Sequence, residues 1–368
     1  MADAELLPVP HEHPKSTARR VAEVLVSLVV VVALFVEVLP RVTGASWSET
    51  GEVLERLGPA DLLLMTALWL VNMASYTWVL TSALPGLGHP QALTVNLAGS
   101  AVSNTVPFGG AVGVGATYGM CMSWGFAPAA ITLSILVTGF WNVFAKLGLP
   151  AAALVLLLLM GEATGGEGLA ALIGLVLLGA TLLVFALVLK SDRLAHKIGH
   201  VAEKVGSVVL RLLRRPPMAS LESRVVEFRD ASIDLVRRKW VPLTVWMVIY
   251  NVLQFGLLML SLRLLGGTDT GLGFAEVFAA FAFARLLGVI PLTPSGAGFV
   301  EVGLAGALKT FGADPALAAA ATVLFSVFTY WIEIPMGAIG WVVWSTKMSW
   351  RRAQVAPSGP TSEPTPAT

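Results

Sequence analysis

Two charged residues lie in otherwise apolar sequence and could bind an anionic group. Arg285 lies about eleven residues into the apolar segment 274–311, and Glu301 follows it in the same segment. About 16 Å of helical rise would put Arg285 near the middle of a bilayer. A charge inside a membrane is costly unless it is compensated, and arginine matches the geometry of phosphate. The two residues therefore predict either an anion site in which Glu301 balances Arg285, or a closed structural ion pair.

Helix-breaking residues lie between these two charges. Pro294, Gly296 and Gly298 precede Glu301 within one short turn. A helix that begins after this turn would direct free backbone N–H groups toward it, which favours an anion. We therefore include the turn in the candidate site.

The same breaks recur earlier in the chain. Pro107 and Gly109 align with Pro294 and Gly296 at an offset of 187 residues, without a gap. Chance coincidence in a glycine-rich chain is the alternative explanation. Paired helix breaks in the two halves of a membrane protein predict a transport site.

The earlier segment offers hydrogen bonds in place of charges. Its polar side chains before the turn are those of Asn96, Ser100, Ser103, Asn104 and Thr105. Such residues could contact a lipid headgroup, although small polar side chains also serve as ordinary contacts between packed helices. We place Ser100, Ser103 and Asn104 in the candidate site, with the packing role as the alternative.

Lys146 and Glu333 share the offset of 187 residues but lie far from the turns. Each lies eighteen residues beyond a proline, which is about 27 Å of helical rise. If the two halves enter the membrane from opposite faces, these residues approach opposite surfaces. We therefore expect them at the interfaces, and expect Glu276 and Lys309 near the outer surface.

These residues must be positioned by membrane helices. The chain has 368 residues, of which 56% are hydrophobic and 13% charged, with a mean hydropathy of +0.78. A soluble domain has about 25% charged residues. Apolar runs near the ~20 residues that cross a bilayer predict an all-α polytopic membrane protein. The predicted spans are 21–39, 61–83, 128–160, 168–190, 241–265 and 315–346.

Two of these spans are too long for a perpendicular helix, so we expect them to tilt or break. Gly148 and Pro150 offer a break in span 128–160, and Pro335 with Gly337 offers one in span 315–346. Between spans, the glycine-rich segments 91–124 and 274–311 are predicted to be re-entrant helical hairpins.

Positive charge predicts the orientation. Twelve of the 24 lysines and arginines lie in residues 190–240, and both termini are basic. The positive-inside rule then makes both termini and this linker cytoplasmic in a cell membrane. Six spans and two hairpins satisfy this arrangement, and they give the two hairpins opposite orientations, as in an inverted repeat.

The expected organisation has five parts. A cytoplasmic arm (1–20) precedes a first membrane half (21–190) with its hairpin, and a basic linker (191–240) precedes a second half (241–346) with the other hairpin. A tail (347–368), rich in proline and serine, is expected to be disordered. The linker is predicted to form amphipathic helices near 192–214 and 219–239 that either lie on anionic headgroups or only connect the halves.

No motif predicts catalysis or a bound cofactor. The glycine turns lack the lysine of a P-loop, and His196 with His200 has no third metal ligand nearby. A single cysteine, Cys121, excludes a disulfide framework, and nothing predicts nucleic-acid binding. We expect a protein that is not an enzyme and uses no cofactor or metal.

One stretch resembles a known family. The run Gly288-Val-Ile-Pro-Leu-Thr-Pro-Ser-Gly-Ala-Gly-Phe-Val-Glu301, followed by Gly312-Ala-Asp-Pro and Tyr330-Trp331, resembles the transmembrane region of lysylphosphatidylglycerol synthases and the free-standing flippase-like proteins that share it. The similarity covers about residues 20–346, and it implies that Pro294, Gly296, Gly298 and Glu301 match the second re-entrant motif.

The resemblance implies lipid translocation. Family members with a soluble C-terminal domain also attach an aminoacyl group to phosphatidylglycerol, and this chain is expected to carry only the translocating half. It departs from the family after the first turn, where Thr117, Tyr118 and Met120 stand in place of a basic residue. The lipid is therefore left open among aminoacylated phospholipids, polyprenyl-phosphate-linked lipids and other anionic lipids.

The sequence thus predicts movement of such a lipid between leaflets, with membrane lipids and a separate lipid-modifying enzyme as partners. Two alternatives stay open at this point. One is a secondary transporter of a small solute, and the other is a non-transporting accessory subunit of cell-envelope lipid synthesis.

Overall fold

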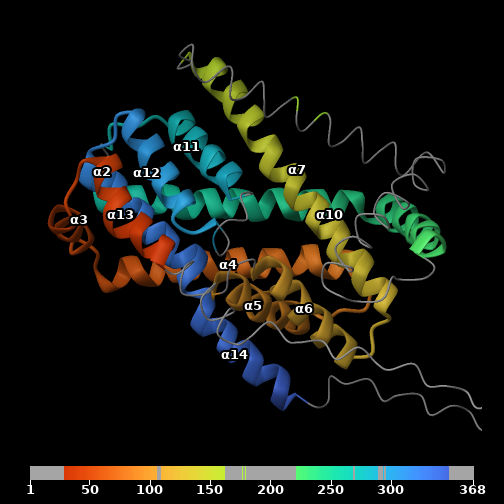
Figure 1. The fold of residues 1–368 in the computed structure, drawn as a ribbon. Helices are drawn as coiled ribbons and strands as arrows, with labels where there is room; N and C mark the ends of the chain where they lie inside the picture. The colour runs from red at the N-terminus through yellow and green to blue at the C-terminus, as the bar shows by residue number, and fades with distance from the viewer. Residues whose placement is uncertain are drawn as a thin grey trace, which may run out of the picture.

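The structure is a computed structural model, and it describes residues 29–105, 109–161, 176, 179, 221–267, 270–288, 293 and 296–347. These residues form helices and contain no β-strand (Figure 1). Almost all of the predicted span 168–190, the N-terminal arm, most of the linker and the tail after residue 347 lie outside the described residues. The chain is an all-α polytopic membrane protein.

Four helices are long and apolar enough to cross a bilayer, or five if one bent pair counts as a span. Two of them are α4 (Pro59–Ala83) and α7 (Pro128–Met160). The third is the membrane part of α10, Asp234–Gly266, and the fourth is Pro315–Thr346. They coincide with the predicted spans 61–83, 128–160, 241–265 and 315–346. The first predicted span, 21–39, is described only from residue 29.

The bent pair lies at the start of the described chain. A π-helical turn, η1 (Leu34–Val38), leads into the short helix α2 (Leu39–Thr43). After a bend of 90°, α3 (Trp47–Leu54) follows, with its N-terminus capped by the side chain of Ser46. This capping fixes where α3 begins, because Ser46 accepts the hydrogen bond from the backbone N–H of Glu49.

Each of the two segments predicted to be a re-entrant hairpin contains a pair of helices. The first consists of α5 (His89–Thr105) and α6 (Gly109–Ser123), and the second of α11 (Phe274–Leu287) and α12 (Phe299–Thr310). These helices have 17, 15, 14 and 12 residues, fewer than the ~20 that cross a bilayer. Within each hairpin the two helices pack on each other. Residues 106–108 of the first turn lie outside the described chain.

The two long spans differ in their helix geometry around proline. Helix α7 runs through Pro150 without interruption, so the break offered there is not taken. The last span does change, but before its proline. It consists of α13 (Pro315–Ser326), the π-turn η3 (Val327–Trp331) and α14 (Glu333–Thr346), with Pro335 just inside α14. Proline has no N–H and its ring crowds the preceding turn, which a π-turn relieves.

The second linker helix and the following span are one element. Helix α10 (Leu221–Gly266) is continuous over 46 residues and contains Pro242. It crosses the whole view in Figure 1, with the first hairpin below it and the second above it. A break between 239 and 241 is therefore not present in the described chain.

Helix α5 is enclosed by two neighbours at very short range. On one side, a Cβ atom at Gly113 of α6 would overlap the Ser103 hydroxyl. On the other, a Cβ atom at Gly337 of α14 would overlap Ala101 and approach the Leu97 carbonyl oxygen to 2.5 Å. Small residues allow helices in a membrane to approach this closely, and here they fix the first hairpin against α14.

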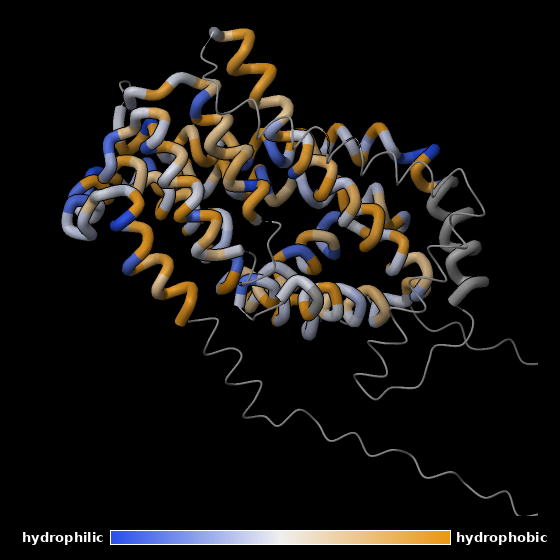
Figure 2. The backbone as a smooth tube through the Cα atoms, turned by 45° about the horizontal axis from the view of Figure 1, so that its top comes forward, coloured by the Kyte–Doolittle hydropathy of each residue, from blue (hydrophilic) through white to orange (hydrophobic). Residues whose placement is uncertain are grey.

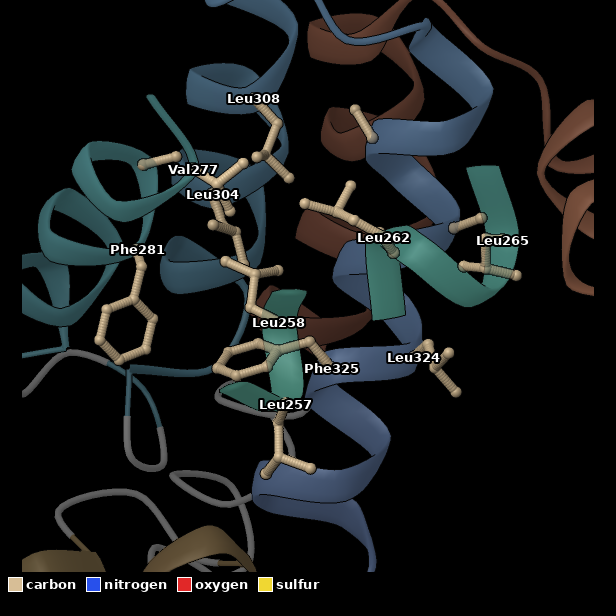
Figure 3. Close-up of a cluster of buried hydrophobic side chains, with 14 of the residues drawn as sticks. Leu257, Leu258, Leu262, Leu265, Val277, Phe281, Leu304, Leu308, Leu324 and Phe325 are labelled. Atoms are coloured by element: carbon tan, nitrogen blue, oxygen red, sulfur yellow. The ribbon is translucent and has the colours of Figure 1, made fainter. Parts of the chain in front are cut away.

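The largest apolar core holds the second hairpin. Leu258 of α10, Phe281 of α11, Leu304 of α12 and Phe325 of α13 are buried in one cluster, which Figure 3 shows in close-up. Figure 2 colours long stretches of the helices as hydrophobic. Large apolar side chains are also exposed, such as Leu63 (71%) and Leu159 (80%). Exposed apolar helix faces of this kind suit contact with lipid.

Candidate functional site

A polar cavity of about 450 Å³ lies between the two hairpins. Its walls come from both helices of the first hairpin, from α4, α7 and α10, from the end of α11 and from the last span. Its volume falls within the ~300–1,000 Å³ typical of ligand sites. The polar residues that line it are Tyr76, Asn96, Ser100, Ser103, Asn104, Thr117, Ser134, Thr138, Asn142, Lys146, Tyr250, Gln254, Arg285, Thr329, Tyr330 and Glu333.

Among the described residues, three charged ones line this cavity: Lys146, Arg285 and Glu333. Lys146 comes from α7, and its Nζ donates a long hydrogen bond of 3.4 Å to the carbonyl oxygen of Gly288. Arg285 lies in the last turn of α11, where its positive charge also suits the negative end of the helix dipole. Arg285 is in electrostatic range of both other groups. With two cations and one carboxylate, the cavity favours an anionic ligand.

The carboxylate of Glu333 is held by the first hairpin. Asn104 Nδ2 lies 3.2 Å from Glu333 Oε2 and 3.1 Å from the carbonyl oxygen of Tyr330, and it donates to both. Ser100, one turn earlier on α5, lies beside the same carboxylate. Glu333 is only 7% exposed. The end of α5 therefore fixes a buried negative charge at the wall of the cavity.

Several polar atoms of the cavity wall have no partner. Among the described residues, Arg285 Nε, Asn142 Oδ1 and Gln254 Oε1 are buried without a hydrogen bond. Gln254 uses its other side-chain atom, Nε2, to donate to the Tyr250 hydroxyl at 2.9 Å. A buried polar group without a partner costs about 1–3 kcal/mol. Three such groups in one cavity suit a site that a polar ligand or water completes.

Two aromatic rings form part of the cavity wall. The rings of Tyr76, from α4, and Tyr250, from α10, have centroids 4.7 Å apart and planes inclined by 46°. A hydrogen bond also joins these two helices. Asn72 of α4 donates to the Tyr250 carbonyl oxygen at 2.9 Å. The part of the wall formed by α4 and α10 is thus well fixed.

The structure brings four of the predicted site residues together. Arg285, Ser100, Ser103 and Asn104 all line the polar cavity. Gly109 lies at its edge, where its carbonyl oxygen accepts a hydrogen bond of 3.2 Å from Ser103 Oγ. Ser103 therefore also joins the two helices of the first hairpin, which is the packing role given above as the alternative. Pro107 and Pro294 lie outside the described residues.

Glu301 has a different position from the one expected. It is fully buried, and its Oε2 accepts a hydrogen bond of 2.6 Å from the backbone N–H of Gly298. It does not line the polar cavity, and no ion pair joins it to Arg285 in the described part of the chain. The carboxylate of Glu301 thus occupies the helix N-terminus at which an external anion was expected.

The backbone of the second turn explains why glycine occupies positions 296 and 298. Gly296 and Gly298 have φ angles of +80° and +87°, which side-chain-bearing residues rarely adopt. A Cβ atom on Gly298 would also lie only 2.5 Å from Leu34 Cδ1 of the first helix. The described end of the turn, at Gly298, is therefore packed against Leu34 of the N-terminal span.

Lys146 and Glu333 were expected at opposite surfaces, yet both line the cavity. The count of helical rise assumed helices perpendicular to the membrane. In Figure 1, α7 crosses α10 obliquely, so residue number along α7 does not convert directly into depth. The shared offset of 187 residues was the signal in the sequence that could have paired them.

A second, apolar cavity of about 800 Å³ lies beyond the first along α7 and α11. Its walls include Pro150 and Leu157 of α7 and Phe283 of α11, and Gly303 and Gly306 of α12 widen it. Its one charged residue, Lys309, donates to the Val42 carbonyl oxygen at 3.1 Å. Its lining suits hydrocarbon rather than a polar group.

The described residues contain no cluster of histidine, cysteine and carboxylate side chains that could hold a metal ion. Cys121 is buried in the core of the first hairpin and is not paired. Cys121 does not line the polar cavity, so it is not a nucleophile for that site.

Comparison with known families gives one match. The family described as the lysylphosphatidylglycerol synthase TM region matches residues 20–337. None of the curated proteins matches the chain. The family match includes both hairpins, the polar cavity and all of its charged residues. The chain therefore belongs to the lysylphosphatidylglycerol synthase TM region family, and its role concerns membrane lipid.

Proposed function

We propose that this protein moves a phosphate-bearing lipid between the two leaflets of a cell membrane. The observation that carries the proposal is the polar cavity between the two hairpins, in which Lys146 and Arg285 outnumber Glu333 and buried polar atoms lack partners. A lipid phosphate would supply acceptors for both cations. The guanidinium of Arg285 suits phosphate oxygens because it can donate two parallel hydrogen bonds.

The position of the cavity supports transport rather than simple binding. The end of α5 and the end of α11 both line it, so a headgroup bound there would contact both hairpins at once. If the hairpins enter the membrane from opposite faces, a shift of one hairpin relative to the other would change the side from which the cavity opens. Inverted repeats around a central site commonly work in this way.

The apolar cavity offers a path for the acyl chains. It follows the polar cavity along α7 and α11, and the two are separated near Lys146, whose ammonium contacts Gly288. Acyl chains need apolar surroundings while the headgroup crosses the polar cavity. The proposal is therefore that headgroup and chains use neighbouring but chemically distinct spaces.

We propose no catalytic step for this chain. The polar cavity has hydrogen-bonding and charged groups, but no nucleophile with an adjacent base among its described lining residues. A separate lipid-modifying enzyme would then supply the substrate, and the termini and basic linker would lie in the cytoplasm.

The unpartnered groups argue against a purely structural role for the cavity. In a scaffold, we would expect the buried atoms Arg285 Nε, Asn142 Oδ1 and Gln254 Oε1 to have protein partners, since unsatisfied buried groups are uncommon. The size of the cavity also suits a headgroup better than a single ion. These observations favour lipid over a small inorganic solute.

A leaflet-resolved assay would test the proposal. The purified full chain would be reconstituted into vesicles whose fluorescent phospholipids carry headgroups of different charge, and a membrane-impermeant quencher would report the outer leaflet. We expect faster exchange than in protein-free vesicles for at least one phosphate-bearing lipid. No acceleration with any anionic, zwitterionic or polyprenyl-phosphate lipid would overturn the proposal.

A further inference from the structure

The two π-turns of the described chain occur in the same local context. In the first span η1 (Leu34–Val38) is followed by Pro40, and in the last span η3 (Val327–Trp331) is followed by Pro335. Because proline lacks an N–H, a carbonyl group one turn earlier loses its usual helical donor. Such interruptions inside α-helices are frequent at functional sites.

In both π-turns, a side chain from another element donates a hydrogen bond to a backbone carbonyl oxygen. Trp47 Nε1 of α3 donates to the Val36 carbonyl oxygen at 3.1 Å. Asn104 Nδ2 of α5 donates to the Tyr330 carbonyl oxygen, also at 3.1 Å. Each π-turn is therefore joined by a hydrogen bond to a neighbouring helix, α3 or α5.

Each π-turn also contacts the end of one hairpin. Leu34 of η1 packs against Gly298, the N-cap residue just before α12 of the second hairpin. Tyr330 of η3 receives Asn104 from the end of α5 in the first hairpin. The π-turns thus lie against the two hairpin ends, although they belong to the first and last spans.

The two π-turns contact each other. The ring of Phe35, in η1, meets the ring of Trp331, in η3, edge to face with centroids 5.7 Å apart and planes inclined by 70°. This pair completes a continuous series of contacts from Gly298 through Leu34, Phe35, Trp331 and Tyr330 to Asn104. We call the two π-turns and this ring pair the aromatic junction.

We infer that Phe35 and Trp331 are positioning residues that couple the two hairpins, so that a shift of one hairpin end is transmitted to the other. Neither ring lines the polar cavity. Trp331 acts through its neighbour Tyr330 and through Asn104, which holds Glu333 at the cavity wall. In the transport cycle, which rests on the proposed function, the junction would keep the two hairpins moving together.

Coupling can be measured without transport, by hydrogen exchange of the full chain in lipid nanodiscs. Phe35→Ala should speed exchange not only in α12, on which η1 packs, but also at the end of α5 (Ala101–Thr105). Trp331→Ala should likewise speed exchange in the second turn of α12 (Val302–Gly306). The expected change is about two- to tenfold, the range for loss of one aromatic pair.

Three further variants make the test specific. The double variant should behave like either single variant, because all three lose the same ring contact. Trp331→Phe should restore most of the protection. Trp341→Ala removes another exposed tryptophan of the last span and should leave both hairpin ends unchanged.

Faster exchange confined to the nearer hairpin in each single variant would overturn the inference. If an alanine variant does not fold, Phe35→Leu keeps an apolar side chain, loses the ring contact and is judged by the same criterion. The outcome is independent of the transport assay. Wild-type protein that moves no lipid would refute the proposed function, while the exchange pattern alone would still decide the coupling.

Discussion

Asn104 and Glu333 are 229 positions apart in the chain and are joined by a hydrogen bond of 3.2 Å at the wall of the polar cavity. The bond links the first hairpin to the last span. It holds a buried carboxylate at the cavity that Lys146 and Arg285 also line, and these two cations make the cavity suitable for an anion. The geometry of the candidate site therefore depends on contacts between the two halves of the protein.

Glu333 offers a direct test of this link. Glu333→Ala should lower the free energy of unfolding by about 1–3 kcal/mol, because it removes the carboxylate that accepts a hydrogen bond from the Asn104 amide. Glu333→Gln keeps an acceptor at the same place and should cost less. Equilibrium unfolding of both variants in detergent micelles would measure the difference. Equal loss in the two variants would contradict the hydrogen-bonding role.

Glu301 should behave as a helix cap and not as a ligand-binding residue. Glu301→Ala removes the acceptor for the Gly298 N–H and should cost about 0.5–2 kcal/mol of stability. Glu301→Gln should retain both stability and lipid translocation. Glu276 is a matched control, since it accepts from the Gly273 N–H at 2.7 Å at the start of α11. A stable Glu301→Gln protein that moves no lipid would show that Glu301 takes part in lipid binding.

The close contact between α14 and α5 should be intolerant of a single methyl group. Gly337→Ala would overlap Ala101 and should destabilise the protein by about 1–3 kcal/mol, a typical cost of overpacking. Gly115→Ala is the control, because a Cβ atom there meets nothing within 4 Å. Thermal unfolding of the two variants should separate them clearly. Similar melting temperatures would mean that α14 does not pack on α5 as described.

The volume of the polar cavity can be reduced without disturbing the fold. Gly139 of α7 lines the cavity, and a Cβ atom there meets nothing within 4 Å. Gly139→Leu should fill part of the cavity and slow lipid translocation at least severalfold, while the melting temperature stays near that of the wild type. Gly115→Leu, outside the cavity lining, is the control. Unchanged translocation with Gly139→Leu would argue that lipid takes another route.

Much of the architecture could be predicted from sequence because the bilayer imposes simple length rules. The limits of α4 and α7 were predicted within two residues of those found, since apolar runs bounded by glycine and proline define membrane helices well. The two hairpins were also predictable, because their proline and glycine breaks repeat. The continuity of α7 through Pro150 was not, since neighbouring helices can tolerate a proline in a membrane helix.

The site was predicted less completely. Arg285 and Asn104 stood out because charge and amide groups are rare in apolar segments. Glu301 was assigned to the ligand because its sequence position beside the turn was clear, whereas its hydrogen bond to Gly298 depends on the backbone of that turn. Lys146 and Glu333 were placed at the surfaces because helix inclination cannot be obtained from residue counts.

Under the proposed function, Arg285 binds the headgroup of a translocated lipid. The most direct measurement compares Arg285→Ala with Arg263→Ala in the leaflet-resolved vesicle assay, because Arg263 lies on the exposed side of α10 and outside the polar cavity. Loss of one charged hydrogen-bonding partner costs about 1.5–3 kcal/mol. We therefore predict that Arg285→Ala slows translocation about tenfold or more, while Arg263→Ala stays near the wild-type rate. A folded Arg285→Ala protein that moves lipid as fast as the wild type would contradict the account.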